Sequence, residues 1–321
     1  MKNILVTFLV IGFSAVVEGA EGQAYPEKPI HLVVGFAPGG GADINARLLA
    51  PKLSEYLGQQ VVVENRPGAG TNIANDYVAK AAADGYTLLL NTAAVAINMS
   101  LYKKLGFDTV RDFAPVSIFS SGPNILAVHP SIRANDIKEL VNVAKSRPGA
   151  LSFSSAGSGT TQHLAGELFK LRTGIDMVHV PYKGSSPSLT ALISGEVGLT
   201  FISVPPIIQH IKAGRVRAIA STGSQRSKLM PDLPTMKEAG VEGVEVSVWY
   251  GVLGPVNITR NIVNNLAQAI KKAAYSDDIK QRLMEQGTEP VGNTPDEFGK
   301  ILRVEVKQWA EVVKASGAQP N

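Results

Sequence analysis

The residues that could do chemistry in this chain sit in loops of glycine, serine and threonine. The first loop lies in "GFAPGGGADINARLL" (residues 35–49), where three consecutive glycines separate a β-branched run from an amphipathic run. Glycine lets a ligand approach the main chain and takes positive φ without strain. The amides that open the next helix lack intrahelical acceptors, and Asp43 is placed to cap them. The pattern predicts an anion site that needs no lysine or arginine.

A second loop, in "SAGSGTTQHLAGELF" (155–169), repeats this arrangement and adds hydroxyl donors. Thr160 or Thr161 is expected to cap its helix. Two more candidates are "NRPGAGTN" (65–72), which also leads into a helix, and Thr92, directly after the strand-like "YTLLL". In open α/β sheets ligands bind beyond the carboxyl ends of the strands. The four stretches therefore predict a cleft lined by amides and hydroxyls; the alternative is that each is an ordinary strand-to-helix turn.

The sequence patterns of common catalysts are missing. No stretch reads GxGxxG or GxSxG, and the small-residue loops lack the lysine of a P-loop. The five histidines have no zinc-binding spacing; they are His31, His129, His163, His179 and His210. His163 either touches ligand or caps and packs its helix, and His179 is expected in the core. Asp43 as a general base would lack a nucleophile or second acid, so we expect no catalysis, cofactor or metal.

Strand-like and helix-like segments alternate along most of the chain, which is typical of parallel sheets covered by helices. Apolar runs predict strands at 30–36, 60–65, 86–90, 124–130, 151–156, 177–182, 197–202, 216–222 and 246–255. Amphipathic spacing predicts helices between most of them, with stops at Gly58 and Gly174. Beyond the last strand three helices are expected, at about 259–274, 276–286 and 295–316. Because this tail brings no new sheet, we predict that it packs on the first α/β unit, which gives two lobes.

The N-terminus has the features of an export signal. Lys2 precedes an apolar stretch at 4–17 that is too short to span a bilayer comfortably, and "GQA" at 22–24 suits cleavage before Tyr25. An uncleaved anchor is the alternative. The chain has no cysteine, which excludes disulfides and thiol catalysis and suits an exported protein of a bacterial periplasm. Its net charge of +4 is mild and scattered, so nucleic acid is not an expected partner.

Several stretches, taken in order, resemble a known family. They are "YPEKPIHLVVGFAPGGGADINARLLAPKLSEYLGQQVVVENRPGAG", "AAADGYTLL", "SSAGSGTTQHLAGELF", "VHVPYKGSSPSLTALISGEV", "STGSQRSKLMPDLPTMKEAG" and "WYGVLGP". Over about residues 25–316 the chain resembles the Bug family, the extracytoplasmic solute receptors of tripartite tricarboxylate transporters. The resemblance implies a type II periplasmic-binding-protein fold, in which two α/β lobes close on a ligand. We expect a signal peptide at 1–24, one lobe at 25–123 plus 247–321, and the other at 124–246.

The resemblance also implies a ligand, partners and a site. Family members hold small carboxylates, among them di- and tricarboxylates, acidic amino acids and aromatic acids, through main-chain amides, hydroxyls and waters. The expected partners are such a carboxylate and the membrane subunits of a tripartite tricarboxylate-type transporter, with the receptor a periplasmic monomer. The expected ligand-binding residues are Ala37, Pro38, Gly39, Gly40, Gly41, Asp43, Gly70, Thr92, Ser155, Gly157, Ser158, Gly159, Thr160, His163, Tyr182 and Ser203.

Some positions depart from the family pattern or leave a choice. After the "TF" strand the chain has Ile202 and Ser203, where many relatives carry an acidic or amide residue. If that position faces the cleft, the pocket is more apolar, which favours plain or aromatic carboxylates over amino acids. Tyr182 is expected near the cleft, and Trp249 either lines the hinge or packs in the core. Two other roles stay open: a sensing module for a membrane kinase, and a hydrolase or lyase of the same fold.

Overall fold

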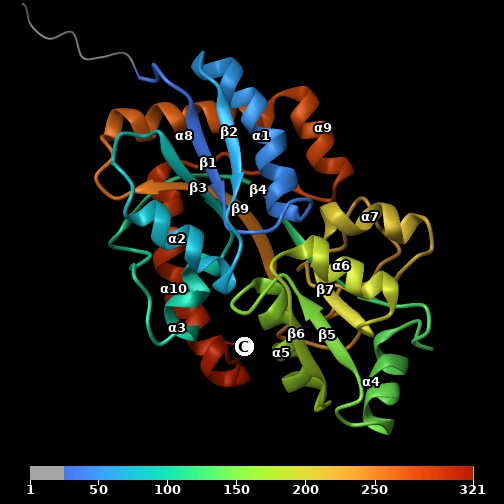
Figure 1. Cartoon of the computed structure of the whole chain (residues 1–321). Coiled ribbons are helices and arrows are strands. Elements are labelled where there is room, and N and C mark those ends of the chain that lie inside the picture. The colour runs from blue at the N-terminus through green and yellow to red at the C-terminus, as the bar shows by residue number, and fades with distance from the viewer. Residues whose placement is uncertain (1–24, 321) are drawn as a thin grey trace, which may run out of the picture.

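The protein folds into two α/β lobes that lie side by side and are joined by long crossing strands (Figure 1). The structure is a computed structural model that describes residues 25–320, so the predicted signal peptide lies outside the described residues. Within these residues no helix has the length and apolar character needed to cross a membrane.

The first lobe is built on three parallel strands, and β1 (Ile30–Val34) lies between β2 (Val61–Asn65) and β3 (Thr87–Asn91). Their connections contain α1 (Gly41–Leu57), a 3₁₀ turn (Ala69–Thr71) and α2 (Asn72–Ala79), and α3 (Ala94–Leu101) follows β3. The stop predicted at Gly58 is confirmed, because this residue caps α1 in the left-handed conformation that glycine favours. The sequence did not indicate α3. The helix α2 ends earlier than predicted by the apolar spacing of its sequence, which continues to Ala81 and Ala82.

The second lobe repeats the parallel arrangement, with β5 (Ser152–Ser155) between β6 (Val178–Pro181) and β7 (Leu199–Ser203). Its helices are α4 (Ile137–Ser146), α5 (Thr161–Thr173), α6 (Ser185–Ser194) and α7 (Val204–Lys212). The strand β8 (Arg217–Ser221) runs in the same direction as these strands and pairs antiparallel with β4 (Phe113–Val128). The left-handed Gly174 ends α5 as predicted.

Two antiparallel strands, β4 (Phe113–Val128) and β9 (Ser247–Pro255), cross between the lobes. The first part of β4 pairs with β9, and residues 124–128 pair with β7 and β8 of the second lobe. The prediction of parallel sheets is therefore confirmed for the strands on either side but wrong for the crossing strands. The sequence predicted a strand only from residue 124, because proline, serine and glycine interrupt the apolar run before it.

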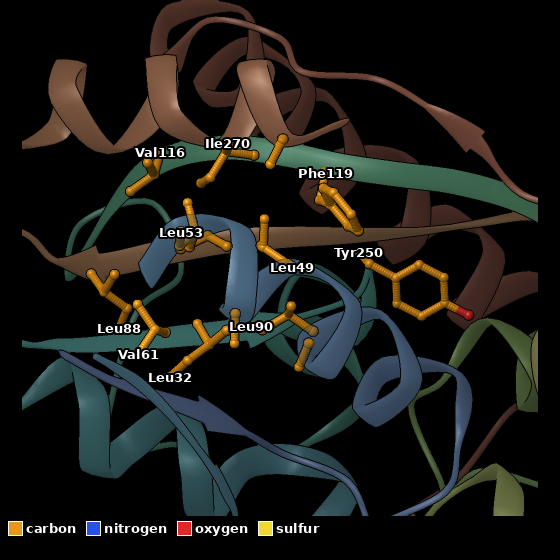
Figure 2. Packing of buried hydrophobic residues seen from close by; sticks show 14 of the residues in the cluster. Leu32, Leu49, Leu53, Val61, Leu88, Leu90, Val116, Phe119, Tyr250 and Ile270 are labelled. Carbon is orange, nitrogen blue, oxygen red and sulfur yellow. The ribbon is translucent and has the colours of Figure 1, made fainter. Parts of the chain in front are cut away.

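The C-terminal tail contains α8 (Arg260–Tyr275), α9 (Asp277–Glu285), a short β10 (Glu289–Pro290) and α10 (Pro295–Ser316). As predicted, α8 and α9 pack on the first lobe: Ile270 joins the core that also holds Leu49 and Leu53 of α1 (Figure 2). The helix α10 lies along α3, and its Trp309 packs against the apolar clusters of both lobes. The tail therefore completes the first lobe, and α10 packs against both lobes where they meet.

Candidate ligand cleft

Two neighbouring hollows lie between the lobes, and we name them the outer and inner chambers. The outer chamber has a volume of about 160 Å³ and is lined by residues 68–71 of one lobe, by 156–158 and 181–183 of the other, and by Tyr102. The inner chamber measures about 10 Å³, which is room for roughly one water molecule. Because Phe36 and Ala156 line both chambers, the two are parts of one cleft.

The lobes are closed on each other around this cleft. The amide of Ala37 in the first lobe donates to the carbonyl oxygen of Lys183 in the second, with an N–O distance of 2.8 Å. Gly70 has a φ of 60°, and a side chain there would collide with the carbonyl oxygen of Ser158 across the cleft. The glycines of the loops therefore allow the main chains of the two lobes to approach each other directly.

The first glycine loop leads into α1 with no side-chain cap. The N-cap residue is Gly40, and the helix begins at Gly41. The prediction that Asp43 caps this helix is wrong, because Asp43 lies in the first turn and its carboxylate reaches back to accept from the amide of Gly39 at 2.9 Å. It also accepts from Arg47 Nε at 3.0 Å and from Asn65 Nδ2 at 2.9 Å.

These contacts decide the charge of Asp43. Burial raises its pKa, but the hydrogen bonds from Arg47, Gly39 and Asn65 outweigh burial and hold the pKa below its usual value. The carboxylate is therefore ionised and fully occupied with donors, so it fixes the shape of the loop and is a poor general base. Gly40 and Gly41 line the inner chamber, while Pro38 and Gly39 are exposed at the rim.

The second glycine loop caps its own helix, as predicted. Thr160 is the N-cap of α5, and its hydroxyl accepts from the amide of His163 at 3.3 Å. The same hydroxyl donates to the carbonyl of Gly157 at 2.7 Å. Gly157 and Ser158 line the outer chamber, whereas Gly159 and Thr160 belong to the lining of neither chamber. This loop contributes main-chain groups to the cleft, while the Thr160 hydroxyl is used to cap α5.

Two stacked imidazoles support the second loop from behind. The rings of His163 and His179 lie 4.0 Å apart between centroids, and Phe153 stacks on His179 at 4.9 Å. Burial lowers the pKa of His163 to about 4 and that of His179 to about 2, and nearby Lys170 adds to both shifts. Both rings are therefore neutral near pH 7. His163 Nδ1 accepts from the amide of Gly159 at 3.3 Å, so its role in this structure is packing and loop support.

The inner chamber gathers residues from both lobes and from the crossing strands. Of the predicted residues, Gly40, Gly41, Thr92 and Ser203 line it. The sequence did not single out its other lining residues, which are Phe36, Ala42, Ala156, Gln162, Ser185, Val248 and Tyr250. No charged side chain of the described residues belongs to the lining. The chamber is therefore electrically neutral apart from the dipole at the start of α1.

Ser203 and Tyr250 are the most unusual pair in the inner chamber. Each side chain is about 1% exposed, and neither hydroxyl makes a hydrogen bond of ordinary geometry within residues 25–320. A Cβ added to Gly41 would lie 2.5 Å from Ser203 Oγ and would also collide with the Tyr250 hydroxyl. Both hydroxyls therefore point at the first residue of α1.

The remaining predicted residues lie around the outer chamber or behind it. Gly70 and Tyr182 line the outer chamber, and the Tyr182 hydroxyl donates to Glu196 Oε1 at 2.6 Å, so only its ring is available to a ligand. The side chain of Ile202 packs in the core of the second lobe, so Ser203 is the position that faces the cleft. Trp249 takes the core alternative, because it packs against Phe298 at 5.1 Å.

Residues 45–318 match the family described as tripartite tricarboxylate transporter family receptor. The chain belongs to this receptor family. Protein BugT of Bordetella pertussis (strain Tohama I) is 36% identical over 320 residues, which cover 99% of this chain and 98% of BugT. The solved structure of R. palustris Rpa4515 with adipate has a TM-score of 0.89 and 38% identity, covering 92% of this chain and 100% of its own. MatC from Rhodopseudomonas palustris with bound malate has a TM-score of 0.86 and 30% identity, covering 90% and 100%.

These matches confirm the solute-receptor family and the two-lobe fold that the sequence predicts. One feature of the receptor could be mistaken for a catalytic pair: Ser155 Oγ lies 2.7 Å from His179 Nε2. Ser155 is fully buried, lines neither chamber, and also accepts from the amide of Gly157 at 3.1 Å. A buried imidazole with so low a pKa is a poor base, so the pair positions the loop. In the described part of the receptor no cluster of acidic or histidine side chains could hold a metal ion.

The residues that sequence reasoning missed carry weak signals. Gln162 lies on the first turn of α5, next to the predicted loop, and Ser185 follows Gly184 in a further strand-to-helix turn. Tyr250 lies inside an apolar strand, where its hydroxyl is invisible to a pattern of hydrophobic residues. The sequence pattern predicts that a tyrosine in the middle of an apolar strand packs in the core. Only the three-dimensional structure shows that the hydroxyl of Tyr250 lies outside the core, in the inner chamber.

Proposed function

We propose that this receptor captures a small carboxylate in the cleft between its lobes and delivers it to membrane subunits of a tripartite tricarboxylate-type transporter. The observation that carries the proposal is the closed cleft lined by glycine main chain and hydroxyls, with the uncapped start of α1 beside it. Helix starts of this kind bind anions without a basic side chain. The adipate in Rpa4515 and the malate in MatC support the same ligand class.

The receptor works by hinge motion and without catalysis. The lobes, taken as residues 25–123 with 247–321 and as 124–246, open and close about β4 and β9. A ligand that contacts both lobes favours the closed state, since it shifts the equilibrium by its differential affinity. Residues 1–24 direct export to the periplasm, where the mature protein acts as a monomer. We expect the predicted ligand residues that line the two chambers to contact the ligand. The predicted residues that line neither chamber stay predictions.

Thermal unfolding of the mature, refolded, ligand-free protein tests this proposal. The panel contains succinate, malate, adipate, citrate, aspartate and benzoate, each beside its amide. A ligand at about 100 times its dissociation constant adds about 2.7 kcal/mol of stability, which raises Tm by a few degrees. We expect a shift with one or more acids that is lost with the matching amide. No shift with any acid, at millimolar concentration, would overturn the carboxylate assignment.

A further inference from the structure

The hydroxyl of Ser203 is left free by the sequence around it. Ser203 is the N-cap residue of α7, and a serine in that place normally accepts a hydrogen bond from the second or third amide of the helix. Here those two positions are Pro205 and Pro206, which have no amide hydrogen. The hydroxyl makes no capping bond, and it is buried beside Gly41 in the inner chamber. It therefore has no structural task in the helix it precedes.

The hydroxyl of Tyr250 also makes no hydrogen bond of ordinary geometry within residues 25–320, for a different reason. Its ring belongs to the core of the first lobe, and Figure 2 shows the oxygen pointing away from the aliphatic side chains of that cluster. Burial raises the pKa of Tyr250 well above its usual value, and the nearby Ser203 hydroxyl only partly opposes the shift. The phenol is therefore neutral at any physiological pH and keeps a proton to donate. A phenylalanine would fill the core equally well, so packing does not explain the oxygen.

The surroundings of these hydroxyls supply more donors than acceptors. The first amides of α1 have no intrahelical acceptor, and both hydroxyl oxygens lie close to Gly41, the first residue of that helix. The side-chain amide of Gln162 also belongs to the chamber. The nearest carboxylate on this helix, Asp43, is occupied by Arg47, Gly39 and Asn65. A chamber of this kind suits an oxygen that accepts hydrogen bonds, and the positive end of the helix dipole disfavours an ammonium group.

We propose that Ser203 and Tyr250 are specificity-determining residues that donate hydrogen bonds to an acceptor oxygen at the inner end of the ligand. This inference rests on the proposed carboxylate function and deepens it. One carboxylate is held in the outer chamber, against the glycine main chain that lines it. One acceptor oxygen at the far end of the ligand, such as an oxygen of the far carboxylate of a diacid, occupies the inner chamber, which has room for roughly one water molecule. A monoacid of the same length leaves both hydroxyls without a partner and is rejected.

Isothermal titration with matched acids tests this assignment. The pairs are succinate with butyrate and adipate with hexanoate, so that only the second carboxylate differs. We expect wild type to prefer the diacid of at least one pair by more than 10-fold. Losing one donor to a charged acceptor weakens binding by about 10- to 100-fold. Tyr250→Phe and Ser203→Ala should therefore weaken diacid binding by such factors and leave monoacid binding within about 3-fold.

Two further readouts separate specificity from structure. Because neither hydroxyl makes a hydrogen bond of ordinary geometry within residues 25–320, Tyr250→Phe and Ser203→Ala should keep or raise the Tm measured without ligand. Tyr275→Phe is the matched control, since its hydroxyl lies at the surface and donates to the Val291 carbonyl at 3.2 Å. A diacid preference that survives both cleft substitutions, or a ligand-free Tm that falls by several degrees, would overturn the inner-chamber assignment alone. Wild type that binds no acid of either kind would instead overturn the proposed function and this inference with it.

Discussion

The two glycine loops that face each other across the cleft begin their helices in opposite ways. In the first lobe, α1 starts at Gly41 with no side-chain cap, and a carboxylate set behind the loop holds its shape. In the second lobe the Thr160 hydroxyl caps α5, and neutral histidine rings support the loop. The amides at the start of α1 are therefore left without a side-chain cap and can bind a ligand, whereas the second loop uses a side chain to cap its own helix. Similar glycine-rich sequences serve different tasks because of the residue that follows the glycines.

The largest effect is expected from filling the open helix start. Gly41→Val places side-chain atoms where Ser203 and Tyr250 already lie, which blocks the inner chamber and holds the lobes apart. We expect ligand affinity to fall by about 100-fold or more, measured by titration calorimetry. Gly40→Val should cost less, because a Cβ at Gly40 would meet the Ser185 amide nitrogen at 3.3 Å.

Gly198→Ala is the control, since its nearest neighbour would lie at an ordinary 3.4 Å from the new Cβ. Wild-type affinity in Gly41→Val would show that the start of α1 is not part of the binding site.

The next effect is a difference between the two loops in how their contributions to folding stability depend on pH. The pKa of His163 is lowered to about 4 in the folded protein, against about 6.5 when unfolded, so the unfolded state binds more protons between these values. Stability from this group is full above about pH 7 and is lost as pH falls toward 4. We expect a loss of about 2 kcal/mol from His163 between pH 7 and pH 5, measured by urea unfolding. Asp43, whose pKa is lowered, loses its contribution only below its usual value and adds no slope in that range.

His163→Gln should reduce this dependence on pH, because the amide can still accept from Gly159 but does not titrate. His129→Gln, a change at a half-buried histidine outside the stack, is the control. An unchanged slope in His163→Gln would mean that His163 does not cause the loss of stability at low pH.

The sequence predicts these loops better than it predicts the junction between them. Glycines, caps and apolar runs act over a few neighbouring residues. The parallel strands of both lobes and the stop at Gly58 are therefore predicted correctly, and so is a threonine cap on α5, expected at Thr160 or Thr161 and found at Thr160. The start of β4 is missed because its pairing with β9 is made by residues more than a hundred positions apart. For the same reason the sequence identified only some of the residues that line the inner chamber. Gly41, Ser203 and Tyr250 come together only when the lobes are assembled. The role of Asp43 is misjudged because its partner Asn65 lies on the next strand.

A smaller effect is expected from loosening the first loop without filling it. Asp43→Ala removes the acceptor of the Gly39 amide, of Arg47 and of Asn65. Hydrogen bonds to a charged group contribute about 1.5 kcal/mol or more, so we expect that loss of stability and a loss of ligand affinity of about 10-fold. Asp43→Asn keeps the shape of the side chain, so its stability and ligand affinity should lie between those of Asp43→Ala and those of wild type. A loss of stability with unchanged affinity would show that the first loop does not need to be held for binding.

The smallest effect should come from the cap of the second loop. Thr160→Ala removes the acceptor of the His163 amide and the donor to Gly157, which costs about 1 kcal/mol of stability. Thr160→Ser keeps the hydroxyl and should recover most of that loss. Because Thr160 lines neither chamber, we expect the dissociation constant for ligand to change by less than about 3-fold in either variant. Affinity that falls with Thr160→Ala as steeply as with Asp43→Ala would make the second loop a ligand donor in its own right, and the two helix starts would then be equivalent.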